Sequence, residues 1–163
     1  MKKFVVLLLV LLPMGAFSQE IKLAFVNFNE VFELIPDYSD ALTKYETIAA
    51  QYQEQLKTLQ TEYQAKYEEY MKIEATLTEN LKLRRQQEIQ DLGERINNFI
   101  PQAQQDLQQE ETKLMAPVQE KVLNAIKAVG EEKGYVIFSS QVFFYTGSII
   151  DATPLVKTKL GIR

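Results

Sequence analysis

Apolar residues recur at helical spacing between Leu42 and Val129, and charged residues and glutamine fill most of the positions between them. In the first half of this stretch the apolar steps alternate between three and four residues, with one lapse at Lys66. Such alternation defines a heptad seam, which is typical of a coiled coil. The first-half seam consists of Leu42, Tyr45, Ala49, Tyr52, Leu56, Leu59, Tyr63, Tyr70, Ile73 and Leu77. Tyr67 lies off this seam, and we expect it to be exposed.

The seam loses its register near residues 75–83, where Thr76, Thr78 and Asn80 are weak helix formers. Two interpretations fit this slip: a hairpin of two helices over residues 37–133 with its tip near 74–83, or one continuous helix with a stutter. The hairpin is favoured because a single rod would leave a tyrosine-rich seam in need of another chain. The return positions would be Leu81, Leu92, Ile96, Phe99, Ala103, Leu107, Leu114, Val118, Val122, Ala125 and Val129.

Pro101 and Pro117 interrupt the predicted return helix. Each removes a backbone hydrogen bond and should kink or divide the helix. The two prolines are either hinges that let the arm flex or tolerated breaks at helix junctions.

Short β-rich segments flank the helical stretch. Ile21–Phe28 is rich in β-branched and aromatic residues and predicts a strand, followed by a short helical turn that Pro36 ends. Asp37 or Ser39 is a plausible N-cap for the first long helix. The predicted fold is therefore α+β, mainly α: a coiled-coil arm on a small β-rich body made of residues 19–36 and 134–163.

The C-terminal part of the body should hold the remaining strands. Tyr135–Phe138 and Val142–Tyr145 predict two strands, and a third short strand is expected at Ile149 and Ile150. Gly134 should end the return helix. Thr153, followed by proline, predicts the N-cap of a last short helix over residues 155–160.

The N-terminus has the pattern of a cleavable signal peptide over residues 1–18. Lys2 and Lys3 precede the unbroken apolar run from Phe4 to Leu12, which is too short for the about 20 residues that span a bilayer. Cleavage is expected after Ser18, and the short lysine-led signal indicates export to a bacterial periplasm. Losing two lysines takes the net charge from −4 to −6, and this acidic balance argues against nucleic-acid binding.

The chain has no cysteine and no histidine. Disulfides, zinc sites built on these residues, and Ser-His-Asp or Cys-His catalysis are therefore excluded. Adjacent glutamates such as Glu68 and Glu69 point about 100° apart on a helix and both meet water, so they do not form a catalytic pair. We expect a protein that is not an enzyme and uses no cofactor.

A basic cluster lies at the predicted tip, where Lys82, Arg84 and Arg85 occupy three of four consecutive positions. It serves either as solvated surface paired with Glu79 or Glu88, or as a contact for an acidic client, lipid headgroups or lipopolysaccharide phosphates.

The order of these parts resembles the Skp/OmpH family of periplasmic chaperones over essentially the whole mature chain. The opening strand Ile21-Lys-Leu-Ala-Phe-Val-Asn27 is similar to the family's first strand. The charged hairpin follows, and then come the segments Lys133-Gly-Tyr-Val-Ile-Phe138, Val142-Phe-Phe-Tyr145 and Asp151-Ala-Thr-Pro-Leu-Val156.

The resemblance implies a homotrimer in which strands of three chains form a β-barrel body and three hairpins surround a cavity. Unfolded outer-membrane β-barrel proteins would be held there without ATP. Trimerisation would bury Leu23, Phe25, Val136, Phe138, Phe143 and Tyr145. The best-known family members have strongly basic arms, whereas this mature chain is acidic, so either its choice of clients or its share of apolar contact is expected to differ. The alternative is a structural or adaptor protein of the cell envelope whose coiled-coil arm binds one folded partner.

Overall fold

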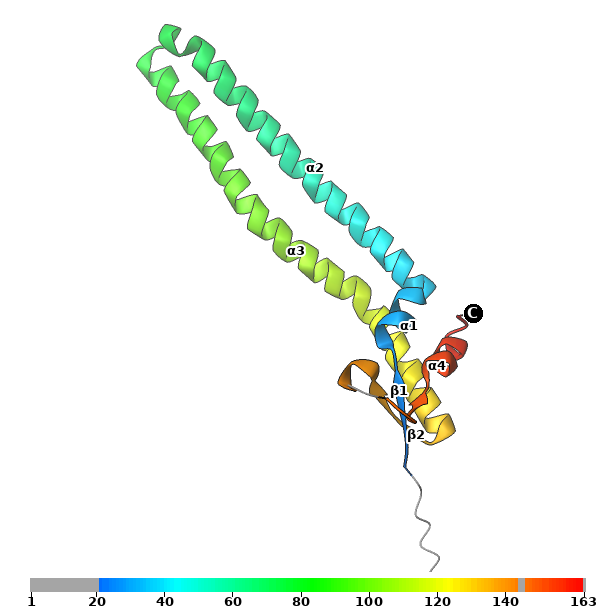
Figure 1. Ribbon diagram of the computed structural model, residues 1–163. Coiled ribbons are helices and arrows are strands. Elements are labelled where there is room, and N and C mark those ends of the chain that lie inside the picture. Colours follow the sequence, from blue (N-terminus) through cyan, green and yellow to red (C-terminus); the bar gives the residue numbers. More distant parts are fainter. Residues whose placement is uncertain (1–20, 144–145, 163) are drawn as a thin grey trace, which may run out of the picture.

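The computed structural model describes residues 21–143 and 146–162. The predicted signal peptide, residues 1–18, and its cleavage point after Ser18 lie outside these residues. Figure 1 shows a small body at one end of the molecule and a long two-helix arm that extends from it. The predicted fold class, a helical hairpin on a small β-rich body, is confirmed.

The arm consists of α2 (Pro36–Ile73) and α3 (Glu79–Lys133), which lie side by side and antiparallel. No glycine or proline follows Pro36 within α2, and its 38 residues therefore form one helix of about 57 Å. The chain reverses through η2 (Glu74–Thr76), where the Thr76 hydroxyl donates a hydrogen bond to the Ile73 carbonyl (2.7 Å). The hairpin, and not the continuous rod, is the structure of the arm.

The heptad seam faces the interior of the hairpin. All first-half seam residues are buried or half-buried, with Tyr70 only 6% exposed, whereas Tyr67 is 44% exposed as expected. On α3, Leu92 and Ala103 are buried. Leu81 is the exception, because it lies in the first turn of α3 beside the reversal and remains 46% exposed.

The body is organised around a three-stranded parallel sheet with the order β2-β1-β3. The central strand, β1 (Lys22–Val26), pairs with β2 (Tyr135–Ser139) along its whole length. On its other side it pairs with the short β3 (Ile150–Asp151). The arm lies between β1 and β2 in the sequence, so this pairing joins the two ends of the chain.

The hydrophobic core lies on one side of this sheet, where α1 (Phe28–Leu34), the start of α2 and the last part of α3 meet. Val31, Ile35 and Val122 are at most 1% exposed. The sequence assigned the end of α3 to the arm, but its side chains supply much of the core of the body: Val118, Val122, Ala125 and Val129.

The short helix α4 (Thr153–Lys159) fastens the end of the chain to β1 and α3. The Asn27 amide donates to the hydroxyl of buried Thr153 (3.0 Å), and the Ala152 amide donates to the Phe25 carbonyl (2.8 Å). Lys159 forms an ion pair with Glu132 of α3, and this pairing lowers the pKa of Glu132.

Three local predictions are wrong. Val142 lies in the 3₁₀ turn η3 (Ser140–Val142) and not in a strand, because Ser139 accepts a hydrogen bond from the Gln141 amide and bends the chain. Helix α2 begins directly after Ile35 with Pro36 in its first turn, so neither Asp37 nor Ser39 is its N-cap. Thr153 is not the N-cap of α4 but its first residue, and Ala152 precedes the helix. The Asp151 carboxylate accepts a hydrogen bond from the Thr153 amide (2.9 Å).

The two prolines do not divide α3, which is one helix of 55 residues. Both prolines are exposed, as are the residues four positions before them, Asn97 and Lys113. Water can therefore hydrate the carbonyls that the prolines leave without a helical partner. Figure 1 shows that α3 changes direction along its length.

Val122→Ala should lower the free energy of unfolding by about 2 kcal/mol, because it deletes buried methyl groups in the core of the body. The neighbouring Leu123→Ala is the matched control, since Leu123 is 49% exposed and its truncation should cost less than about 0.5 kcal/mol. Urea unfolding at one fixed protein concentration measures both. Equal losses would contradict the placement of the core.

Candidate functional site

The face of the sheet that points away from the core is apolar and has no cover among the described residues. Ala24 and Val26 of β1 point into the core, so the alternating side chains of Leu23 and Phe25 point to the opposite face. The register pairs Leu23 with Val136 and Phe25 with Phe138. We call this surface the open sheet face; it consists of Leu23, Phe25, Val136, Phe138 and Phe143.

Exposure on the open sheet face is high for such side chains. Leu23 and Val136 are 44% and 45% exposed, and Phe138 is 39% exposed. Phe143 packs against Phe138 edge to face, with ring centroids 5.6 Å apart. The structure thus brings together five of the six residues predicted for a trimer core. The sixth, Tyr145, lies outside the described residues.

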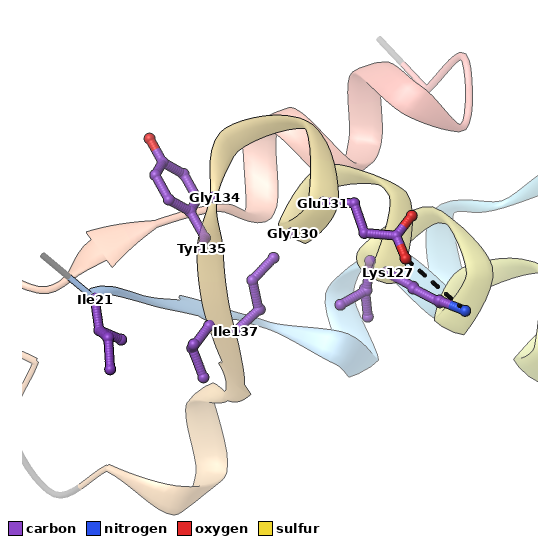
Figure 2. A pocket seen from close by; sticks show the side chains of 9 residues that line it. Ile21, Lys127, Gly130, Glu131, Gly134, Tyr135 and Ile137 are labelled. Atoms are coloured by element: carbon purple, nitrogen blue, oxygen red, sulfur yellow. Dashed lines mark ion pairs between the residues drawn. The ribbon is translucent and has the colours of Figure 1, made fainter. Parts of the chain in front are cut away.

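A hollow of about 540 Å³ lies between β2 and the end of α3 (Figure 2). Ile21, Val136 and Ile137 contribute apolar lining. In Figure 2 the ion pair between Lys127 and Glu131 (3.9 Å) lies on the α3 side of this hollow. Among the described strands, β2 pairs only with β1, so its other edge is free. This edge adjoins the open sheet face, because Val136 and Phe138 belong to β2.

Along the arm, the seam includes a polar contact between the helices. The Tyr52 hydroxyl donates a hydrogen bond to Asp106 Oδ2 (3.1 Å), and the Tyr52 ring lies 6.1 Å from that of Phe99. Burial, and then the hydrogen bond to Asp106, raise the pKa of Tyr52 above 10.0. The neutral phenol thus helps to hold α2 against α3.

Near the tip, a groove of about 600 Å³ runs between the two helices. We call it the distal groove. Its α2 side carries Tyr63, Tyr67 and Met71, of which Tyr67 and Met71 are 44% and 54% exposed. Its α3 side includes Ile89 and Gly93. The sequence analysis singled out Tyr67 but not Gly93, for which a glycine inside a helix was the only available signal.

A second tyrosine closes the seam at the tip end of this groove, beside the reversal. The Tyr70 hydroxyl donates to Glu74 Oε1 and accepts from Gln86 Nε2, both at 2.8 Å. Burial, and then the hydrogen bond to Glu74, raise the pKa of Tyr70 above its ordinary value.

The basic cluster lies at the start of α3, but its two arginines are paired. Arg84 contacts Glu88 (3.4 Å), and Arg85 contacts both Glu88 (3.0 Å) and Glu69 of α2 (4.0 Å). The hydrogen bond from Arg85 lowers the pKa of Glu88. The positive field of Lys82, Arg84 and Arg85 is therefore partly compensated locally, and two exposed leucines lie among them, Leu81 and Leu83.

In the described part of the chain, no group of acidic side chains is arranged to hold a metal ion. None of the described helices combines the length and the apolar character needed to cross a bilayer.

A family model described as outer membrane protein (OmpH-like) matches residues 22–160. The match includes every described strand and helix, from β1 to α4. A comparison with the curated proteins finds no matching relative.

The pH dependence of arm stability should show the contribution of Tyr52. Because its folded pKa is raised, the stabilisation is fully present below the unfolded value of 10.0 and is lost as the pH rises through the folded value. Tyr52→Phe cannot ionise, so the wild-type advantage in thermal midpoint should shrink between about pH 8 and about pH 11. Thermal unfolding followed by circular dichroism at each pH measures this difference in midpoint.

Tyr67→Phe is the control, because it changes an exposed tyrosine on the same helix. A wild-type advantage over Tyr52→Phe that stays constant with pH would show that folding does not raise the pKa of Tyr52.

Proposed function

The chain belongs to the OmpH-like family, whose members are outer-membrane-protein chaperones, and we propose that it is an ATP-independent periplasmic holdase. Family members are non-enzymatic and periplasmic and bind unfolded outer-membrane proteins. In our proposal this protein holds unfolded outer-membrane β-barrel proteins in a cavity between helical arms and prevents their aggregation.

The observation that carries the proposal is the open sheet face. Parallel sheets are almost always covered on both faces, whereas among the described residues this one is covered on one face only, mainly by α3. We infer that a second protein surface covers Leu23, Val136 and Phe138 in solution. We propose that this surface comes from further copies of the chain, which assemble as a homotrimer and also occupy the free edge of β2.

Assembly through the body would create the cavity. The arm extends from one end of the body (Figure 1), so copies joined at their sheets hold several arms of about 57 Å around a common space. Many weak contacts along such arms give avidity without a deep pocket and need no nucleotide. Release then follows when the client folds and withdraws its apolar segments.

The arms offer apolar contacts within an acidic surface. Taken together, residues 19–35 and 134–163 contain equal numbers of basic and acidic residues, so the whole net charge of −6 lies on the arm. Half-exposed apolar side chains occur along the arm towards its tip, and they include Tyr67, Met71, Leu81, Leu83 and Ile100. We propose that apolar contact, and not capture of acidic clients by basic arms, is the main source of affinity.

The test combines sedimentation with aggregation. The mature protein should sediment as a trimer and keep a urea-unfolded outer-membrane β-barrel soluble in a defined complex after dilution. Leu23→Gln with Val136→Gln should reduce both the trimer and the soluble client severalfold, because the open sheet face becomes polar. A trimer that leaves the client to aggregate would favour the adaptor alternative.

Leu34→Gln is the matched control, since Leu34 is 51% exposed on α1 and lies outside the open sheet face. It should leave trimer and client binding unchanged. If Leu34→Gln reduced trimer and soluble client as much as the double variant, the loss would come from general destabilisation. The open sheet face would then not be the assembly surface.

We also propose that Lys82, Arg84 and Arg85 give the tip a weak contact with acidic client segments or with anionic lipid and lipopolysaccharide headgroups. Changing all three to Gln should weaken binding to client and to anionic vesicles, by about twofold to fivefold at low salt, and flatten its salt dependence. Lys44→Gln, Lys57→Gln and Lys113→Gln together give the charge-matched control. If the two triple variants bound client and vesicles equally well, the cluster would be ordinary solvated surface and not a contact site.

A further inference from the structure

We propose that the distal groove binds client segments in which an aromatic side chain lies next to lysine or arginine. This inference deepens the proposed function, because it names the client chemistry that one part of the arm selects. It rests on the aromatic surface of the groove, its acidic rim and the missing side chain at Gly93.

The aromatic surface of the groove is partly unpaired. The rings of Tyr63 and Tyr67 are stacked, with centroids 6.4 Å apart and an angle of 7° between their planes. Tyr67 is 44% exposed, so part of this stack faces solvent. A tyrosine face attracts both other aromatic rings and cations, and arginine in particular stacks on it.

The charged side chains that line the groove are all acidic. They are Glu74, which also accepts from Tyr70, and Glu94. The nearby cation Arg85 is engaged by Glu69 and Glu88. A positively charged side chain that lies on the tyrosines would therefore meet two carboxylates, whereas an acidic one would be repelled.

The floor of the groove is open because position 93 has no side chain. Glycine is the poorest helix former except proline, so its presence inside α3 weakens the helix. Packing does not require it: a Cβ atom at Gly93 would lie 3.6 Å from Tyr63 Cε2, an ordinary contact distance. The consequence of glycine here is room for about one methyl group between the α3 backbone and the Tyr63 ring, which keeps the floor of the groove low beside that ring.

The remaining lining supports an extended chain as the occupant. Gln86, Gln90 and Asn97 lie along the α3 side and offer amide donors and acceptors to a peptide backbone. An unfolded client presents such backbone groups and its side chains together, whereas a small cation presents neither.

The test uses the full mature protein and three labelled peptides of equal length, in which tyrosine alternates with lysine, tyrosine with glutamate, or serine with lysine. Fluorescence anisotropy should show that the tyrosine–lysine peptide binds about tenfold more tightly than either of the others. Equal binding of all three peptides would overturn the proposal.

Two variants locate the site. Gly93→Leu should fill the groove and weaken binding of the tyrosine–lysine peptide about tenfold while raising the thermal midpoint of the arm, so the loss cannot come from unfolding. Glu74→Gln with Glu94→Gln should remove the preference for lysine over glutamate. Asn98→Leu places the same side chain at an exposed position of α3 outside the groove and should bind as wild type.

Unchanged peptide binding by Gly93→Leu would overturn the proposal. If this variant also changed the assembly state of the protein, the groove would be assigned to contact with a second copy of the chain. The proposed holdase function is tested separately. If wild type and Gly93→Leu both keep the β-barrel client soluble but neither prefers the tyrosine–lysine peptide, only the groove fails. If wild type leaves the client to aggregate, the holdase function fails whatever the peptides show.

Discussion

β1 can form a sheet only when residues from the far end of the chain lie beside it. Both of its partners, β2 and β3, are parallel to it, and parallel strands need a long crossover connection. Here the connection to β2 is the entire arm. The hairpin must bring the end of α3 back to the body before β2 can pair with β1. The arm therefore projects from the body and is also the connection on which the sheet depends.

The same pairing explains why the body is incomplete. Two strands of five residues and one of two bury little apolar area by themselves, and the core depends on Val118, Val122 and Val129 of α3. One helix end covers one face of the sheet. The other face keeps Leu23, Val136 and Phe138 partly exposed, which a parallel sheet does not normally tolerate.

The sequence predicted the arm better than the body, for a physical reason. The heptad steps from Leu42 to Leu77 are local and depend only on helical geometry, so seam and reversal could be recognised directly. Strand pairing depends on contacts between distant residues, and the pattern at Val142 could not show that Ser139 would cap a turn there. The sequence pattern also could not show that the end of α3 belongs to the core of the body, because an apolar stripe on a helix has the same spacing whether it packs against another helix or against a sheet.

Among the candidate surfaces, the family resemblance implied Leu23, Phe25, Val136 and Phe138 as buried on assembly, and the strand register places all four on one face. The distal groove was not predictable, because it arises from the alignment of Gly93 with Tyr63 across the hairpin, and that alignment depends on where the chain reverses.

The topology also has a consequence for how the chain is made. β1 is among the first elements to emerge during synthesis, but its sheet partners are among the last, and no described strand lies between them. The body therefore cannot close until nearly the whole polypeptide is available. Because the sheet joins residues as distant as Lys22 and Tyr135, its formation waits for the slow closure of a very long loop, and β1 remains without its partner until the hairpin has formed.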